Sequence, residues 1–267
     1  MKTYSAIFRI RFIHGFQYRI TAFSQMFIGF VWGLMLALAF TAFYRANPDN
    51  FPMGLSQVVS YMWLQQILYT LFSVVVWEYD ETELALEEGS VAYELIRPVG
   101  LYGRWFSRVC AGRTAPALLS LPVLIPAFLL PAPYGISLPP DVFQFIMFLI
   151  STVLALFVTV AITMLMYVTM FHTISISGTK MAVSMFVQFF AGGVVPLPFF
   201  PAGLRAVCEL LPFAAMQNIP LRIYGGNIAG ANALKGIAFQ IIWLVVLILF
   251  GKVTMSRALK IVTVQGG

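Results

Sequence analysis

The chain has 267 residues, of which 60% are hydrophobic and only 10% charged, and its mean hydropathy is +0.89. A soluble domain carries about 25% charged residues, so this chain cannot cover a water-exposed surface. The formal net charge of +6 does not indicate a nucleic-acid partner, because the basic residues flank long apolar runs, where they orient membrane helices. The composition excludes a soluble globule and predicts one all-α integral membrane domain over residues 1–267.

The chain begins with an amphipathic stretch, residues 1–19. It lacks the short basic tip and the small-residue cleavage site of a secretory leader. Phe8, Phe12 and Phe16 recur every four residues, the spacing of a buried apolar stripe on one helix face. We expect an amphipathic helix here.

Six apolar runs follow that are candidates for spanning helices, each of which needs about 20 mainly apolar residues. They are residues 20–44, 55–77, 114–130, 142–171, 180–195 and 231–255. The third run contains several prolines and is expected to be bent, because proline removes a helical hydrogen bond. This helix can begin before residue 114 if its basic residues lie on an amphipathic first part.

The basic residues predict the orientation of the bundle. With six spans and a cytoplasmic N-terminus, twelve Lys and Arg residues fall on the cytoplasmic side: Lys2, Arg9, Arg11, Arg19, Arg97, Arg104, Arg108, Arg113, Lys180, Lys252, Arg257 and Lys260. Four fall outside: Arg45, Arg205, Arg222 and Lys235. The positive-inside rule therefore places both termini in the cytoplasm.

The connection between the second and third spans, residues 78–100, is rich in acidic residues. It reads "ETELALEEGSVAYELIRPVG" over residues 81–100, with acids at helical spacing and apolar side chains between them. The apolar contacts come from Leu84, Val91, Leu95 and Ile96. We expect two short surface helices that either form a docking site for another cytoplasmic protein or serve as a solvated connection.

Polar and small residues within the spans have two interpretations. Gln25, Gln65, Gln66, Gln144, Gln188 and Gln240 are expected mainly to hydrogen-bond across helices, while a minority could line a polar path. Gly29 and Gly33 form a small-xxx-small pair that fits either packing within the chain or an interface with a second subunit.

Motifs for chemistry are missing from the sequence. His14 and His172 have no second ligand placed for zinc, and neither a serine-hydrolase elbow nor an ATP-binding phosphate loop is present. Cys110 and Cys208 do not suggest a disulfide framework and are expected to be packing residues. We predict no catalytic, cofactor-binding or metal-binding residue in this chain.

Two stretches resemble the permease subunits of type-2 ATP-binding-cassette (ABC) exporters. They are "EGSVAYELIRPVGLY" at residues 88–102 and "GGVVPLPFFPAGLRAVCELLPFAAMQNIPLRIYGG" at residues 192–226. The resemblance implies six spans, an N-terminal elbow helix at the inner interface, and a coupling helix at about residues 81–96. It also implies two copies of a separate ATPase that bind ATP and Mg²⁺, and a second permease, identical or related.

The resemblance further assigns roles to two sets of residues. The ATPase-docking set is Glu83, Leu84, Glu87, Glu88, Gly89, Val91, Glu94, Leu95, Arg97 and Pro98. Residues 196–220 are implied to be short re-entrant helices that form an outer gate, with Pro196, Pro198, Phe199, Phe200, Pro201, Leu211, Pro212 and Phe213. The alternative for this segment is an interfacial loop with no role in transport.

The expected function is the transmembrane subunit of an ATP-driven exporter in a bacterial cytoplasmic (inner) membrane, with a hydrophobic or amphipathic substrate. One alternative is a lipid-modifying membrane enzyme built on Arg104, Arg108, Arg113 and His172, which have no paired carboxylate in an obvious motif. The other is an ion-coupled secondary transporter. The absence of acids within the apolar runs and of a visible repeat argues against it.

Overall fold

The computed structural model describes residues 2–17, 19–46, 51–75, 81–87, 90–173 and 176–260, and all regular structure within these ranges is helical. The first half comprises α1 (Lys2–Gly15), α2 (Arg19–Ala46), α3 (Leu55–Ile67), α4 (Tyr69–Phe72), α5 (Glu81–Glu87), α6 (Val91–Leu95), α7 (Leu101–Ser120), η1 (Leu121–Val123) and α8 (Leu124–Leu129). The second half comprises α9 (Val142–Met170), α10 (Ile176–Phe190), η2 (Leu197–Phe199), α11 (Ala202–Leu210), η3 (Pro212–Ala215), α12 (Asn218–Tyr224) and α13 (Ala231–Ala258).

Four helical segments in the described part of the chain are long and apolar enough to cross a membrane. They are Ile20–Ala46, Leu101–Leu129, Val142–Met170 and Ala231–Ala258. The second expected span is the 13-residue α3 followed by the short α4, and the fifth is the 15-residue α10. At 1.5 Å per residue, α3 and α10 are shorter than the roughly 30 Å apolar core of a bilayer. The count of six spans therefore stays a prediction.

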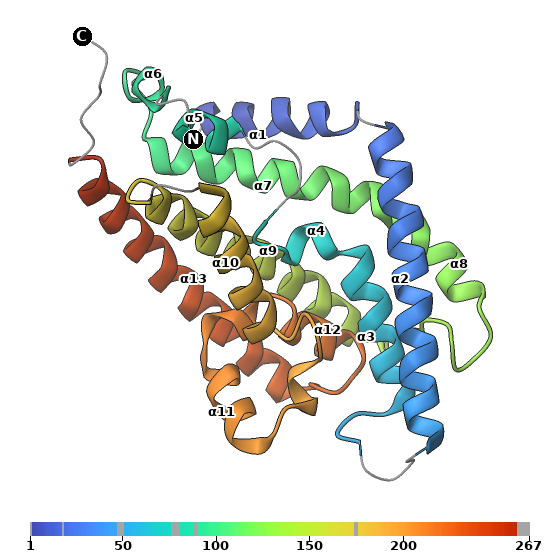
Figure 1. Ribbon diagram of the computed structural model, residues 1–267. Coiled ribbons are helices and arrows are strands. Elements are labelled where there is room, and N and C mark those ends of the chain that lie inside the picture. Colours follow the sequence, from blue (N-terminus) through green and yellow to red (C-terminus); the bar gives the residue numbers. More distant parts are fainter. Residues whose placement is uncertain are drawn as a thin grey trace.

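Helix α1 lies alongside α7 at one end of the bundle, crossing the direction of α2 (Figure 1). Tyr4 packs against Gly103 and Gly15 against Ala115, so the two helices run side by side in the same direction. The expected buried stripe on α1 is only partly correct. Phe8 packs against the main core, whereas Phe16 is 36% exposed.

Helix α9 forms the centre of the bundle and packs against α13, α12 and α7. Its buried face continues over most of its length and includes small and hydroxyl side chains that allow close approach. Ser151 donates a hydrogen bond of 2.9 Å to Gln240 of α13, which fixes the register of this central pair.

The third span is bent, as its prolines predict. Helix α7 begins at Leu101, before the apolar run, and carries Pro116 within it. A 3₁₀ turn with Pro122 separates it from α8. Because prolines cannot donate to the helical ladder, the segment changes direction here, and α8 lies beyond the far end of α7 (Figure 1).

Candidate functional site

The candidate partner-binding region is the connection of residues 78–100, which we call the coupling segment. The structure describes its residues 81–87 and 90–100, so the predictions for Glu88 and Gly89 lie outside the described residues, as does the side chain of Glu87. The two short helices expected here are α5 and α6. They lie near α1 at one end of the bundle, together with the C-terminal end of α13 (Figure 1).

Glu94 in α6 turns its carboxylate toward α7. Its Oε1 accepts a hydrogen bond of 2.8 Å from Arg108, and its Oε2 accepts one of 3.1 Å from Arg104. The indole N–H of Trp105 also donates to Oε2. Arg104 further donates to the backbone carbonyl of Glu94 at 2.7 Å. Both the side chain and the backbone of α6 are thus fixed to the first turns of α7.

The surroundings of Glu94 favour its charged form. Burial acts to raise the pKa of this carboxyl, but hydrogen bonds from Trp105 and Arg108 and the charges of Arg108 and Arg104 outweigh burial, so the pKa lies below its ordinary value. The side chains of Arg104 and Glu94 are only 3% and 15% exposed. This ion pair is therefore screened much less by salt than a surface pair.

The contacts of Glu94 bear on two expectations: the partners of Arg104 and Arg108, and the docking role of Glu94 itself. No obvious sequence motif pairs a carboxylate with Arg104 and Arg108, but the structure places Glu94 against both arginines. The three residues form no obvious motif, and the chain must turn through Pro98 before the arginines reach Glu94. A docking role for Glu94 stays a prediction, and it has to accommodate a carboxylate that already faces α7.

A second ion pair attaches α5 to α10. Lys180 Nζ lies 2.6 Å from Glu83 Oε2, and the two side chains are 19% and 15% exposed. Of the neighbouring predicted docking residues, Leu84 is half-buried and Val91 is buried in the main core. The two helices of the coupling segment are therefore attached to two different helices of the bundle, α5 to α10 and α6 to α7.

The rest of α6 and the turn after it present an exposed surface. Tyr93, Leu95 and Ile96 are 74%, 40% and 81% exposed. Arg97 and Pro98 are exposed next to them. Three predicted docking residues, Leu95, Arg97 and Pro98, are thus accessible, and Tyr93 is exposed beside them although it was not predicted. Its spacing of three residues from Ile96 is the signal that could have identified it.

Arg113 in α7 is buried within the bundle, with 2% of its surface exposed. Its guanidinium donates to the backbone carbonyls of Ser73 and Val74. It also donates to Thr163 Oγ1 of α9 at 2.7 Å. Ser73 and Val74 follow the end of α4, where carbonyls have no α-helical partner. Arg113 therefore joins the end of α4 to α7 and α9, which accounts for a buried cation in this bundle.

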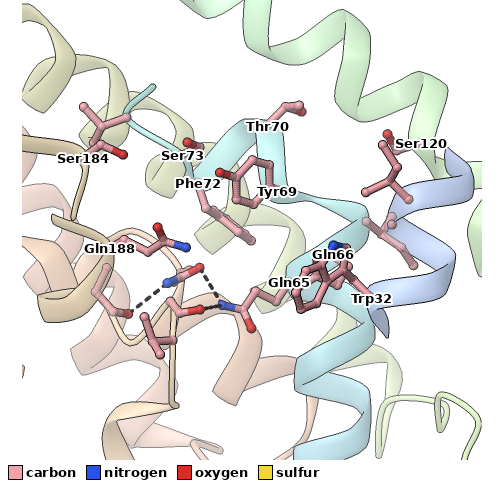
Figure 2. Close-up of a pocket in the computed structure, with 18 of the residues that line it drawn as sticks. Trp32, Gln65, Gln66, Tyr69, Thr70, Phe72, Ser73, Ser120, Ser184 and Gln188 are labelled. Carbon is pink, nitrogen blue, oxygen red and sulfur yellow. Dashed lines mark hydrogen bonds between the residues drawn. The ribbon is translucent and has the colours of Figure 1, made fainter. Parts of the chain in front are cut away.

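A cavity of about 660 Å³ opens between α2, α3, α4 and α10. Figure 2 shows Gln66 and Trp32 on one side of it and Gln188 on the other, with Thr70 and Ser73 along a third edge. Five glutamines line it, and we call it the glutamine cavity: Gln25, Gln65, Gln66, Gln188 and Gln217. Among the described residues that line this cavity, none carries a charged side chain.

The structure separates the six glutamines of the predicted spans into two groups. Gln144 donates to the carbonyls of Ile223 and Ile228, and Gln240 donates to those of Ser151 and Ala215. Gln65 donates to the Gly193 carbonyl, so the structural interpretation is confirmed for Gln65, Gln144 and Gln240. Three others make no side-chain hydrogen bond with the described part of the chain: Gln25, Gln66 and Gln188.

The segment of residues 196–220 lies at the end of the bundle opposite the coupling segment (Figure 1). It consists of short helices and 3₁₀ turns, as its prolines predict. Pro196, Pro198 and Pro212 are buried, Leu211 is half-buried and Pro201 is exposed.

Aromatic rings hold this segment to the bundle. Phe199 packs against Phe40 at 5.7 Å between ring centroids, and against Phe51 at 6.0 Å. Phe200 and Phe213 contact rings on α10. The segment is thus anchored to α2 and α10, and its role as an outer gate stays a prediction.

Gly29 and Gly33 face α3 of the same chain. A Cβ added at Gly33 would lie 2.6 Å from the Trp63 ring, and one at Gly29 would lie 3.8 Å from the Gln66 carbonyl oxygen. Packing within the chain, the alternative interpretation, therefore accounts for Gly33. A subunit interface at this pair stays a prediction.

The four long apolar helices found among the described residues are those of a multi-pass membrane protein. The chain matches the ABC-2 family transporter protein family over residues 18–266, and it belongs to that family. The resemblance seen in the two sequence stretches is thereby confirmed. The chain is the transmembrane component of an ABC transporter, and membership implies pairing with an ABC ATPase. No curated protein and no solved structure matches this chain.

Proposed function

We propose that this chain is the permease of an exporter that moves a hydrophobic or amphipathic substrate out of the cytoplasm or the inner leaflet of a bacterial cytoplasmic membrane. Two permease chains, identical or related, form the path. Two copies of a separate ATPase bind ATP and Mg²⁺ and supply the energy. The chain itself catalyses no reaction, and both of its termini are cytoplasmic.

The main support for this proposal is the exposed apolar surface formed by Tyr93, Leu95 and Ile96. It lies beside the ion pairs of Glu94 with Arg104 and Arg108. Apolar and aromatic side chains are typical of the centre of a protein interface. A partner that moves α6 also moves α7, because Glu94 joins them. A partner that moves α5 acts on α10 through Glu83 and Lys180. The two attachments provide a route from a docked ATPase into the bundle.

The arrangement of the helix ends supports a cytoplasmic position for this surface. Helix α1, the coupling segment and the C-terminal end of α13 lie at the same end of the bundle (Figure 1). By the six-span assignment, the basic residues favour that end as the cytoplasmic side by twelve to four. An ATPase that binds cytoplasmic ATP can reach the coupling segment only from this side.

The test is co-purification of an ABC ATPase subunit with the tagged chain, followed by ATP hydrolysis of the recovered complex in lipid nanodiscs. Ile96→Asp places a charge in the exposed apolar surface, and we expect it to lower co-purification of the ATPase about tenfold or more. Leu210→Asp is the matched control, because Leu210 is 71% exposed on α11 at the opposite end. Equal recovery of the ATPase with both variants would contradict the proposed docking surface.

A further inference from the structure

The glutamine cavity has the chemistry of a binding site for an uncharged group. Its volume of about 660 Å³ lies within the roughly 300–1,000 Å³ of small-molecule sites. An ion placed there would meet no opposite charge among the described lining residues, and an unpaired ion away from water is costly. The basic Arg113 is not a lining residue, since its guanidinium binds the Ser73 and Val74 carbonyls.

The glutamines of the cavity differ in whether they are already engaged. Gln65 donates to the Gly193 carbonyl at 2.7 Å, and Gln217 donates to the Ala191 carbonyl at 3.3 Å, so these two hold the wall formed by the loop after α10 (Figure 2). Gln66 and Gln188 lie on opposite sides of the cavity, and their amides make no hydrogen bond with the described part of the chain.

Each free amide provides two donors and an acceptor oxygen. Gln25 on α2 adds a third such amide, and Tyr69 adds a phenol whose hydroxyl also has no hydrogen-bond partner in the described residues. A ligand with several hydroxyl or amide groups matches this set, because each of its groups can both donate and accept. A purely apolar ligand would leave the amides unpaired, which disfavours it.

One wall of the cavity is apolar and open to the side. Ile28 and Trp32 of α2 line it and are 51% and 50% exposed. Leu36 continues the same face one turn further along α2. The apolar part of a ligand can lie along this face while its polar part reaches the glutamines, so the site suits an amphipathic molecule with an uncharged head.

We propose that the glutamine cavity binds the uncharged, hydroxyl- or amide-bearing head of an amphipathic substrate, with Gln66 and Gln188 as specificity-determining residues. This inference rests on the proposed transport function and narrows its substrate class. It is tested by direct binding to the chain without the ATPase, so the failure of one proposal does not imply the failure of the other.

The experiment uses three photoreactive amphiphiles that share one diazirine-bearing decyl chain and differ in the head: glucosyl, trimethylammonium or sulfate. Each is added to the purified full chain in phosphatidylcholine nanodiscs, and labelled peptides are mapped by mass spectrometry. We expect saturable labelling of α2, α3 and α10 by the glucosyl probe, about tenfold stronger than by either charged probe.

Variants of the two free glutamines separate recognition from folding. Gln66→Leu and Gln188→Leu are expected to lower the saturable labelling about fivefold to tenfold each, the effect of one lost hydrogen bond. Gln17→Leu, an exposed glutamine outside the cavity, should leave labelling unchanged. Gln66→Glu should shift preference toward the trimethylammonium probe, a change that a purely structural role would not produce.

Three results would overturn the inference. The first is stronger saturable labelling of the cavity by a charged probe than by the glucosyl probe. The second is glucosyl labelling that is non-saturable or confined to peptides outside the cavity. The third is glucosyl labelling that Gln66→Leu and Gln188→Leu leave unchanged while both variants elute as folded protein.

Discussion

The two ends of this bundle hold their irregular backbone by different means. At the coupling segment, short helices are attached by ion pairs, Glu94 with Arg104 and Arg108, and Glu83 with Lys180. At the opposite end, the Arg222–Glu209 ion pair joins the short helices α12 and α11 to each other, but the contacts of η3 and the α12 region with the long helices come mainly from neutral side chains. There, Gln144 donates to the carbonyls of Ile223 and Ile228, and Gln240 donates to that of Ala215.

The two kinds of attachment follow from the different surroundings of the two ends of the bundle. Backbone at membrane depth needs its polar groups paired, and a neutral amide does this at a lower desolvation cost than an ion. An end that binds a soluble partner can place charges near water, where they also fix direction and register. The end whose short helices are joined to long helices by ion pairs thus suits transmission of force from an ATPase, and the end joined to them by neutral amides suits passage of a substrate.

Removing the carboxylate of Glu94 is expected to cause the largest loss of stability, and it tests directly whether ion pairs hold the coupling segment. Glu94→Leu leaves Arg104 and Arg108 shielded from water without a counter-charge, and we expect a loss of about 3–5 kcal/mol in the free energy of unfolding. Thermal unfolding in detergent measures it, with Leu95→Ala on the exposed side of α6 as the control. A loss below about 1 kcal/mol would show that these contacts do not hold α6.

The pH dependence of stability tests the same contribution of Glu94. Because the folded-state pKa of Glu94 lies below the ordinary value of about 4.3, its stabilisation is fully present above that value. It is lost as the pH falls through the lowered folded-state pKa. The stability difference between the wild type and Glu94→Gln should therefore persist at neutral pH and shrink only below about pH 4. A difference that disappears near pH 6 would contradict this assignment.

At the opposite end, the next largest loss of stability is expected from removing the amide of Gln144. Gln144→Leu leaves the carbonyls of Ile223 and Ile228 without this donor, and we expect destabilisation by about 1–3 kcal/mol. Gln17→Leu makes the same chemical change on an exposed residue and should have almost no effect. If both variants unfold at the same temperature, the amide does not hold α12 to α9.

Disturbing the packing of α2 on α3 is expected to cause a somewhat smaller loss of stability. Gly33→Ala forces a methyl group against the Trp63 ring and should cost about 1–2 kcal/mol. Gly29→Ala makes only an ordinary contact and should be nearly neutral. Equal stability of the isolated chain with the two variants, combined with loss of permease pairing, would instead favour a subunit interface at these glycines.

The smallest stability effect is expected for the link between α5 and α10. Glu83→Lys breaks the pair with Lys180, and because both side chains retain some exposure the loss should be about 1 kcal/mol or less. ATP hydrolysis coupled to transport should nevertheless fall, and the double variant Glu83→Lys/Lys180→Glu should recover part of it. Recovery in the double variant separates an internal link from direct contact of Glu83 with a partner.

Much of the fold could be predicted from the sequence, because long apolar runs and clustered prolines act locally. The long helices α2, α9 and α13 lie close to their predicted spans, and the third span bends at the 3₁₀ turn that contains Pro122. The lengths of α3 and α10 could not be predicted, since apolar composition does not say where a helix ends. The end of α4 depends on Arg113, 39 and 40 residues from the carbonyls it binds.

The candidate site was predictable in position but not in detail. The acidic connection and its two helices follow from local pattern and resemblance. The partners of Glu94 depend on a turn that brings α6 back against α7, and the free amides of Gln66 and Gln188 are distinguished from Gln65 only by three-dimensional packing. Residues of identical chemistry on neighbouring positions thus acquire different roles.

Cysteine cross-linking tests the central claim, that an ATPase drives this chain through the coupling segment. Cys110 and Cys208 are free and buried, so an introduced surface cysteine reacts with little background. A maleimide–benzophenone reagent attached to Ile96→Cys should photo-cross-link to the ATPase subunit in nanodiscs, while the same reagent on Leu210→Cys at the opposite end should give no such product. Cross-linking of the ATPase through Leu210→Cys, or through neither position in an actively hydrolysing complex, would contradict the account.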